Sequence, residues 1–106
     1  MLVTAKLFLE MRTIYENKEI PLEFDDERVT VKDAIVRLLD TDPSGERGAR
    51  QVLLDHVARP WNITTDNLNP AMVIMINDVD FKLCGGFDAE LVDGDAITFL
   101  PTIHGG

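Results

Sequence analysis

The amino-acid sequence predicts an α+β fold in which one mixed β-sheet carries helices on one face. Apolar residues alternate with the two-residue period of a strand near both ends of the chain. Between these segments lies a stretch with the apolar spacing of an amphipathic helix. A strand pair, then a helix, then further strands is the element order of a sheet that helices cover on one side. The 106 residues fit a single domain.

The first two strands are expected at residues 2–10 and 19–25. In each segment every second residue is apolar, so one side of each strand can face a core. The apolar positions are Val3, Ala5, Leu7 and Leu9 in the first segment and Ile20, Leu22 and Phe24 in the second. A polar stretch separates the two segments, and we expect them to pair as an opening hairpin.

The main helix is expected to begin after Thr30, whose hydroxyl suits the N-cap position. Asp33 favours the positive end of a helix, although a strict capping box would have Glu or Gln there. The stripe that would face the sheet comprises Val31, Ala34, Ile35, Leu38 and Leu39. Pro43 and Gly45 would end this helix. A second, short helix is expected within residues 46–58, with Ala49, Val52, Leu53 and Val57 as its buried stripe.

The second half of the chain is expected to supply the other strands of the sheet. Residues 72–76 are continuously apolar, which is typical of a central strand buried on both faces. The remaining segments are punctuated by Gly, Asn, Asp and Pro. They are a loop at 60–70, a turn at 77–78, a short strand at 79–83 that ends at Gly85 and Gly86, a turn at 93–95 and a last strand at 96–102.

The charge of the chain excludes several classes of function. Asp and Glu number 19 against 10 Lys and Arg, for a net charge of -9. Nucleic-acid backbones and anionic lipid surfaces attract basic proteins, so strong direct binding to either is disfavoured. A basic protein partner is the natural complement, because opposite charges steer association.

The cysteine content and the apolar segments predict a soluble protein of a reducing compartment. Cys84 is the only cysteine, so no intrachain disulfide can form. Lys6 and Glu10 interrupt the apolar N-terminal run, unlike the apolar region of a signal peptide. No run approaches the roughly 20 apolar residues of a membrane span. We expect a cytoplasmic protein, with the nucleus also compatible.

The candidate reactive group is the C-terminal carboxylate of Gly106. Without Cβ atoms, Gly105 and Gly106 can extend into a narrow tunnel and leave the terminal carbonyl open to attack. We therefore divide the chain into a domain over residues 1–101 and a flexible tail over residues 102–106. A carboxylate is a poor acyl donor until it is activated, and the sequence has no Walker-type glycine loop. ATP would be used by a partner enzyme, and this chain would bind no cofactor.

Other reactive residue types have simpler explanations. Cys84 is a candidate nucleophile only if the fold brings His56 beside it, and a packed or half-exposed thiol is the favoured alternative. The acidic runs at 25–27 and 93–95 lack the ligand spacing of an EF-hand loop, so turn and helix-flanking roles explain them better. Two distant histidines and one cysteine predict no metal site. His104 is an ordinary solvated residue or a partner contact able to aid proton transfer.

The last third of the sequence resembles a known family. The likeness lies in MINDVDF at residues 75–81, in the acidic and apolar run from 88 to 95 and in the HGG that ends the chain. These features are similar to the ubiquitin-related modifier family of sulfur carriers. The molybdopterin-synthase small subunit and the thiamine-pathway sulfur carrier are relatives that share the Gly-Gly end. The resemblance implies a β-grasp, ubiquitin-like fold with one main helix packed on the sheet and a second short helix.

The resemblance also implies a function, in which the chain is a carrier and co-substrate rather than an enzyme. An E1-like enzyme with a rhodanese-type domain would adenylate the tail with ATP and convert it to a thiocarboxylate. A separate tRNA thiolation enzyme would then pass the sulfur to a wobble uridine at its 2-position. The same activated tail is suited to joining lysines of target proteins. Gly106 would react, Gly105 and His104 would thread into the partner, and Ile103 and Leu100 would be further contacts.

Three alternatives remain open. Within the same family, the chain would deliver sulfur as the small subunit of molybdopterin synthase, and co-purification with the large subunit would distinguish that role. In a different class, it would be a β-grasp interaction module without covalent chemistry, and replacing Gly106 with Ala would leave its activity unchanged. A free-standing enzyme is the least supported, because the sequence offers no catalytic constellation.

Overall fold

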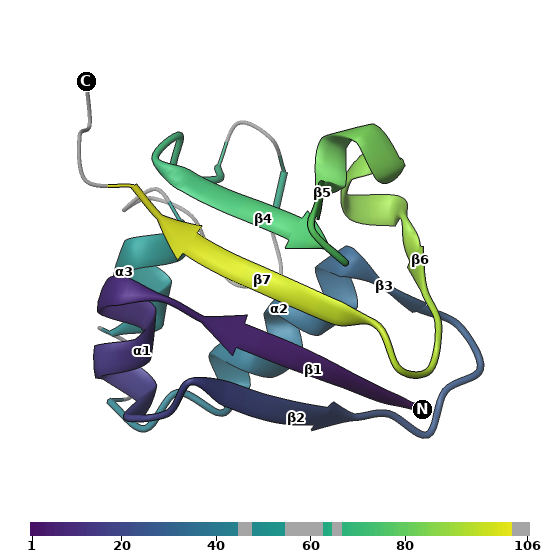
Figure 1. The fold of residues 1–106 in the computed structure, drawn as a ribbon, viewed down its shortest axis with the longest axis horizontal. Helices are drawn as coiled ribbons and strands as arrows, with labels where there is room; N and C mark the ends of the chain where they lie inside the picture. Colours follow the sequence, from purple (N-terminus) through teal and green to yellow (C-terminus); the bar gives the residue numbers. More distant parts are fainter. Residues whose placement is uncertain (45–47, 55–62, 65–66, 103–106) are drawn as a thin grey trace.

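The computed structural model describes residues 1–44, 48–54, 63–64 and 67–102. Its main sheet has five strands in the order β2-β1-β7-β4-β5 (Figure 1). The central strand, β7, is parallel to its neighbour β1, and the other neighbours are antiparallel. The strands are β1 (Leu2–Leu7), β2 (Glu19–Glu23), β4 (Met72–Ile76), β5 (Val79–Asp80) and β7 (Ala96–Pro101), with β3 (Val29–Thr30) and β6 (Glu90–Leu91) in a separate pair.

The helices cover one face and one end of this sheet. Figure 1 shows α2 (Val31–Asp40) behind the sheet, with α1 (Leu9–Tyr15) and α3 (Ala49–Leu53) at the end toward which β1 and β7 run. Two short 3-10 helices, η2 (Phe81–Cys84) and η3 (Gly86–Asp88), follow β5. The predicted α+β class with one mixed sheet and helices on one face is confirmed.

The predicted pairing of the first two strands is confirmed, but a helix connects them in place of a simple turn. Met11 and Tyr15, four residues apart, are both buried and so define the inner side of α1. Leu9 was expected on the buried face of the first strand, and this was wrong. It begins α1 and is 48% exposed, because the strand ends at Leu7.

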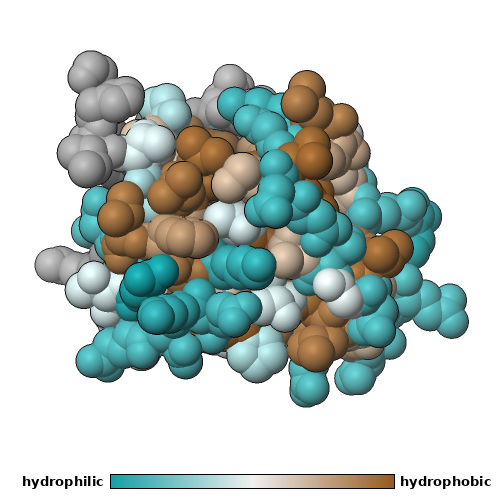
Figure 2. Space-filling view, viewed as in Figure 1, coloured by the Kyte–Doolittle hydropathy of each residue, from teal (hydrophilic) through white to brown (hydrophobic). Residues whose placement is uncertain are grey.

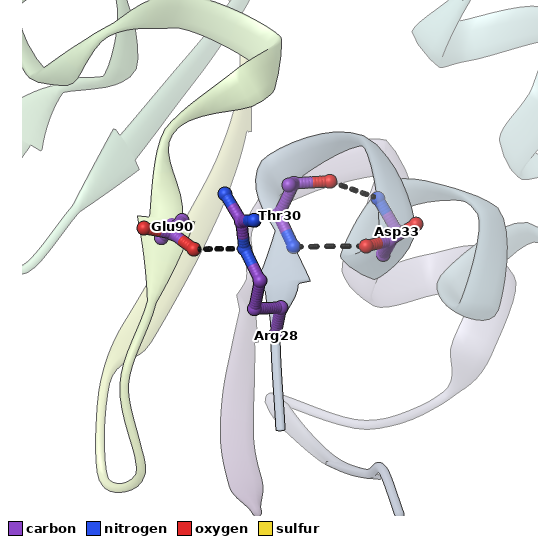
Figure 3. Close-up of polar contacts among 4 residues, drawn as sticks. All are labelled: Arg28, Thr30, Asp33 and Glu90. Atoms are coloured by element: carbon purple, nitrogen blue, oxygen red, sulfur yellow. Dashed lines mark hydrogen bonds and ion pairs between the residues drawn. The ribbon is translucent and has the colours of Figure 1, made fainter. Parts of the chain in front are cut away.

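Helix α2 matches its prediction in start, end and buried stripe. All five apolar residues of the expected stripe are buried. Figure 3 shows the capping box at its start: the Thr30 hydroxyl accepts from the Asp33 amide at 3.2 Å, and the Asp33 carboxylate accepts from the Thr30 amide at 2.9 Å. Asp therefore completes the box in place of Glu or Gln. The nearby Arg28–Glu90 ion pair joins the β3 and β6 segments at the surface, where such pairs contribute little.

The predicted second helix is present as α3. Ala49 and Leu53 are buried as expected and Val52 is half-buried, while Val57 lies outside the described residues. Gly48 precedes the helix where there is no space for a side chain, since a Cβ there would lie 1.8 Å from the Ser44 hydroxyl oxygen.

Two expectations for the second half need correction. Residues 72–76 form a strand, but only Met72, Ile74 and Ile76 are buried, whereas Val73 and Met75 are half-exposed. None of the helices in the described residues covers that side of the sheet, so the run is not buried on both faces. The short strand expected at 79–83 ends at residue 80, and residues 81–84 form η2, because the Asp80 side chain accepts from the Lys82 amide and turns the chain.

The turns at the other end of the sheet fit the prediction. Asn77 and Asp78 both have positive φ, as a tight two-residue hairpin turn requires. Asp95 accepts from the Val92 amide at 2.8 Å, and Asp93 accepts from the Leu2 amide at 2.7 Å. The acidic residues at 93 and 95 therefore fix the turn that leads into β7, which is the structural role expected from the sequence.

We predict that Thr30→Ala lowers the free energy of unfolding by about 1 kcal/mol, because it removes the N-cap hydroxyl of α2. Urea unfolding of both proteins measures the difference. Thr13→Ala removes the same atoms from an exposed position on α1 and should change stability by less than about 0.5 kcal/mol. Equal losses for the two variants would contradict the capping assignment.

Candidate functional site

The candidate site is the point where the chain continues past the last strand. The Thr102 amide and the Thr102 hydroxyl both donate to the Ala71 carbonyl, each at 2.7 Å. Pro101, just before it, is buried. The strand that carries the tail is therefore anchored to the sheet up to Thr102. The predicted tail contacts Ile103, His104, Gly105 and Gly106 lie outside the described residues, so their roles and the flexibility of the tail stay predictions.

Partly exposed apolar side chains lie at this end of the sheet, on the strands and at the start of α1. We call them the exit patch: Phe8, Leu9, Val73 and Leu100. Phe8 is 37% exposed, and Leu100 and Val73 pair across β7 and β4 and are half-exposed. Figure 2 shows brown, hydrophobic side chains gathered over this end of the sheet. Of the patch, only Leu100 was predicted from the sequence as a contact.

The parallel pairing of β1 and β7 assembles the exit patch. The Phe8 amide donates to the Phe99 carbonyl at 3.2 Å, so the first residue past β1 still lies beside β7. Leu9 then adopts a φ of 51°, in the left-handed region, and starts α1. The Arg12 guanidinium lies 5.5 Å from the centroid of the Phe8 ring, and its Nε donates to the Leu7 carbonyl at 3.3 Å.

The sequence did not predict Phe8, Leu9 and Val73 as contacts, because period-two alternation identifies only the buried residues of a strand. Val73 was assigned to a fully buried run, and Leu9 to the core face of the first strand. Phe8 lies on the outward side of that alternation. An aromatic residue on the exposed side of a strand indicates a contact surface, and this signal could have identified Phe8.

A groove of about 470 Å³ lies beside Thr102, between the ends of α1 and α3. Its described lining includes one carboxylate, Glu10, and no Cys, His or Lys side chain. The lining residues are Glu10, Thr13, Ile14, Gly48, Gln51, Val52, Asn69, Ala71, Pro101 and Thr102. The two hydroxyls of this set donate to backbone carbonyls, Thr13 to Leu9 and Thr102 to Ala71, and neither is hydrogen-bonded to the Glu10 carboxylate in the described structure.

The other reactive candidates do not form a site in the described part of the chain. Cys84 is exposed, and its Sγ lies 3.6 Å from the Asp80 carbonyl oxygen. His56, its suggested partner, lies outside the described residues. Within residues 1–44, 48–54, 63–64 and 67–102, no group of three or more His, Cys, Asp and Glu is arranged to hold a metal ion.

Tyr15 is a structural residue rather than a proton donor for chemistry. Its hydroxyl donates to the Leu38 carbonyl at 2.5 Å and so ties α1 to α2. Burial raises the pKa of Tyr15 well above its ordinary value, and the Asp42 carboxylate raises it further, while a hydrogen bond with Thr41 lowers it. The hydroxyl therefore stays protonated at neutral pH.

The geometry defines a class of protein. A mixed sheet that folds around one main helix, with the last described strand at its centre, is the β-grasp or ubiquitin-like arrangement. The solution structure of small archaeal modifier protein 1 from Methanosarcina acetivorans superposes with a TM-score of 0.76. It is 28% identical to this chain, and the match covers 99% of this chain and 96% of that one. A chain of the Amycolatopsis orientalis BexX/CysO complex matches with a TM-score of 0.69 at 25% identity, over 98% of this chain and 99% of that one.

The family follows from the sequence comparisons. The model of the family Urm1 (Ubiquitin related modifier) matches residues 6–106, and the chain belongs to that family. A ubiquitin-related modifier 1 homolog of Dictyostelium discoideum is 28% identical over 108 residues, covering 100% of both chains. The homolog of Drosophila willistoni is 43% identical over 44 residues, which span 42% of this chain and only 44% of that protein. The resemblance predicted from the last third of the sequence is thus confirmed.

The sequence also predicts that the chain has no membrane-spanning segment. None of the helices in the described part of the chain is long and apolar enough to cross a membrane.

We predict that Thr102→Val loosens the base of the tail, because it removes the hydroxyl bond to the Ala71 carbonyl. The loss of one such bond should lower the free energy of unfolding by about 1 kcal/mol. Amide hydrogen exchange at residue 102 should also become faster. Thr4→Val is the matched control, since Thr4 lies on the open face of β1. Unchanged exchange at residue 102 would contradict the anchoring role.

Proposed function

We propose that this chain is a ubiquitin-like sulfur carrier whose reacting group is the carboxylate of Gly106. One observation carries the proposal: the family match extends to residue 106 and so includes the terminal Gly105 and Gly106. The fold supports it, because the described chain runs from the centre of the sheet directly into this end. In this function the chain is a co-substrate, and the catalytic groups belong to its partners.

The proposed reaction begins with adenylation. An E1-like enzyme joins the Gly106 carboxylate to the α-phosphate of ATP, and pyrophosphate leaves. A persulfide on a rhodanese-type domain then attacks the carbonyl carbon and expels AMP, which leaves an acyl disulfide. A thiol of the enzyme then attacks the cysteine sulfur of the rhodanese-type domain within this acyl disulfide. The tail keeps the terminal sulfur as a thiocarboxylate, and the enzyme keeps a disulfide.

The chain contributes position rather than catalysis to this reaction. Four residues beyond Thr102 span at most about 14 Å when fully extended. An enzyme that holds the Gly106 carboxylate must therefore lie over the end of the sheet where Thr102 is anchored. The exit patch is the apolar surface at that end, so Leu100 is its contact nearest to the tail in sequence. Ile103, His104 and Gly105 would enter the channel of the enzyme.

The proposed acceptor is a tRNA wobble uridine, thiolated at its 2-position by a separate enzyme. The net charge of -9 supports a division of labour in which that enzyme, rather than the carrier, holds the RNA. Transfer of the same activated tail to lysines of target proteins is a second outcome of one chemistry. Both uses place the protein in the cytoplasm, with the nucleus also compatible.

Two other functions can be separated from this one. A small subunit of molybdopterin synthase would co-purify with a large synthase subunit. The putative molybdopterin converting factor subunit 1 of Pyrococcus furiosus matches with a TM-score of 0.65 but at 20% identity, which supports the shared fold alone. A non-covalent interaction module would keep its binding after Gly106→Ala.

We predict that adding one alanine after Gly106 abolishes adenylation, because the reacting carboxylate is then one residue too far along the tail. Folding should be unchanged, since β7 ends at Pro101. The experiment incubates each protein with the E1-like enzyme, ATP and thiosulfate and follows pyrophosphate release, which accompanies adenylation, and the mass of the product.

The control for this experiment is Lys82→Ala, an exposed substitution on η2. It should be adenylated and thiolated like the original chain. An alanine-extended protein that accepts sulfur at the original rate would contradict the proposed reacting group.

A further inference from the structure

Lys6 lies on the open face of the sheet, one residue before the end of β1. Its neighbours Ala5 and Leu7 are fully buried on the side of α2, so Lys6 points to the opposite side. The register places it beside Thr98 of β7 and opposite Glu19 of β2. Lys6 is half-buried, so its aliphatic stem covers part of the face while the ammonium group reaches toward solvent.

The ammonium group of Lys6 has no partner within the described part of the chain. It forms no ion pair there, even though Glu19 is its neighbour across the strands. Arg12, the cation at the edge of the exit patch, is already engaged with the Phe8 ring and the Leu7 carbonyl. Lys6 is therefore an uncommitted positive charge beside an apolar patch.

This charge stands out against the rest of the molecule. The chain has a net charge of -9, so its surface repels most carboxylates that approach it. A carboxylate that meets the open face at Lys6 is attracted instead. A contact of this kind fixes the register of two surfaces and selects among partners, because a misplaced acidic group meets like charge.

We propose that Lys6 aligns the adenylating enzyme on the sheet. A carboxylate of that enzyme, set among apolar side chains, pairs with Lys6 while the surrounding surface covers the exit patch. The inference rests on the proposed function, because it is the enzyme's hold on Gly106 that brings it to this end of the sheet. Thr98, beside Lys6, lies four residues before Thr102, or about 13 Å along the strand. The contact at Lys6 and the contact at the base of the tail are thus close enough to lie within one interface of ordinary size.

The test compares three variants in ATP-dependent adenylation of the complete chain by the E1-like enzyme. Lys6→Glu reverses the charge, and Lys6→Met removes it while keeping an apolar stem. Lys82→Glu changes the net charge as much as Lys6→Glu does, at an exposed position on η2. It therefore measures only the effect of net charge on association with the enzyme. Urea unfolding of each variant establishes that it is folded. KM and kcat are measured separately at low and at high salt.

We expect Lys6→Glu to raise KM by at least about tenfold and Lys6→Met by about threefold to tenfold. The kcat values should stay within about twofold of the original, because Lys6 positions the enzyme and takes no part in the chemistry. Lys82→Glu should change KM by less than about twofold, and its effect should vanish at high salt.

Adenylation of the unsubstituted chain distinguishes a failure of the role of Lys6 from a failure of the proposed function. If that chain is adenylated normally and Lys6→Glu changes KM no more than Lys82→Glu does, the role of Lys6 is overturned while the proposed function stands. If the unsubstituted chain is not adenylated at all, the proposed function itself fails. Loss of sulfur transfer to tRNA with normal adenylation would also overturn the proposal, because it would assign Lys6 to the acceptor enzyme.

Discussion

The parallel pairing of β1 with β7 is the interaction on which the rest of the structure depends. It joins the first and last strands of the chain at the centre of the sheet, where Ile97 and Phe99 of β7 are fully buried. Parallel strands run in the same direction, so the end of β1 and the end of β7 meet at one edge. The same pairing brings Phe8, whose amide donates to the Phe99 carbonyl, beside the end of β7 and so assembles the exit patch. The arrangement suits the proposed function, because β7, which leads toward the proposed reacting residue, cannot fray without breaking the core.

The molecule thereby separates an anchored base of the tail from the proposed reacting group. The described chain is hydrogen-bonded up to Thr102, and the proposed reacting carboxylate lies four residues beyond it. Such a carrier needs no catalytic pair of its own, and the described hydroxyls of the groove beside Thr102 donate to backbone carbonyls. Specificity would instead reside in the surface that partners must cover to reach the tail. The exit patch supplies apolar area there, and Lys6 supplies the charge that would orient a partner.

Sequence patterns predicted the elements that depend on local signals. They failed where contacts between distant segments determine the secondary structure or the burial. Thr30 and the apolar stripe after it defined α2 correctly, because capping and helical periodicity act within one segment. Helix α1 was missed, since the buried pair Met11 and Tyr15 is too short a signal to stand out in a polar stretch. The run at 72–76 was predicted to be buried on both faces, because its composition does not show that the described helices cover only one side of the sheet. Of the candidate site, only Leu100 could be both predicted and placed. The decisive residues 103–106 remain predictions from the sequence and from the family.

The most direct test of the central claim is the intact mass of the protein isolated from its own cells under conditions that protect thiols. The account predicts a fraction that is heavier by one exchange of oxygen for sulfur, with the added mass in the peptide that ends at Gly106. If only the plain carboxylate is found, even after incubation with ATP, an E1-like enzyme and a sulfur source, the sulfur-carrier function is contradicted. A non-covalent interaction module of the same fold would then be the better description.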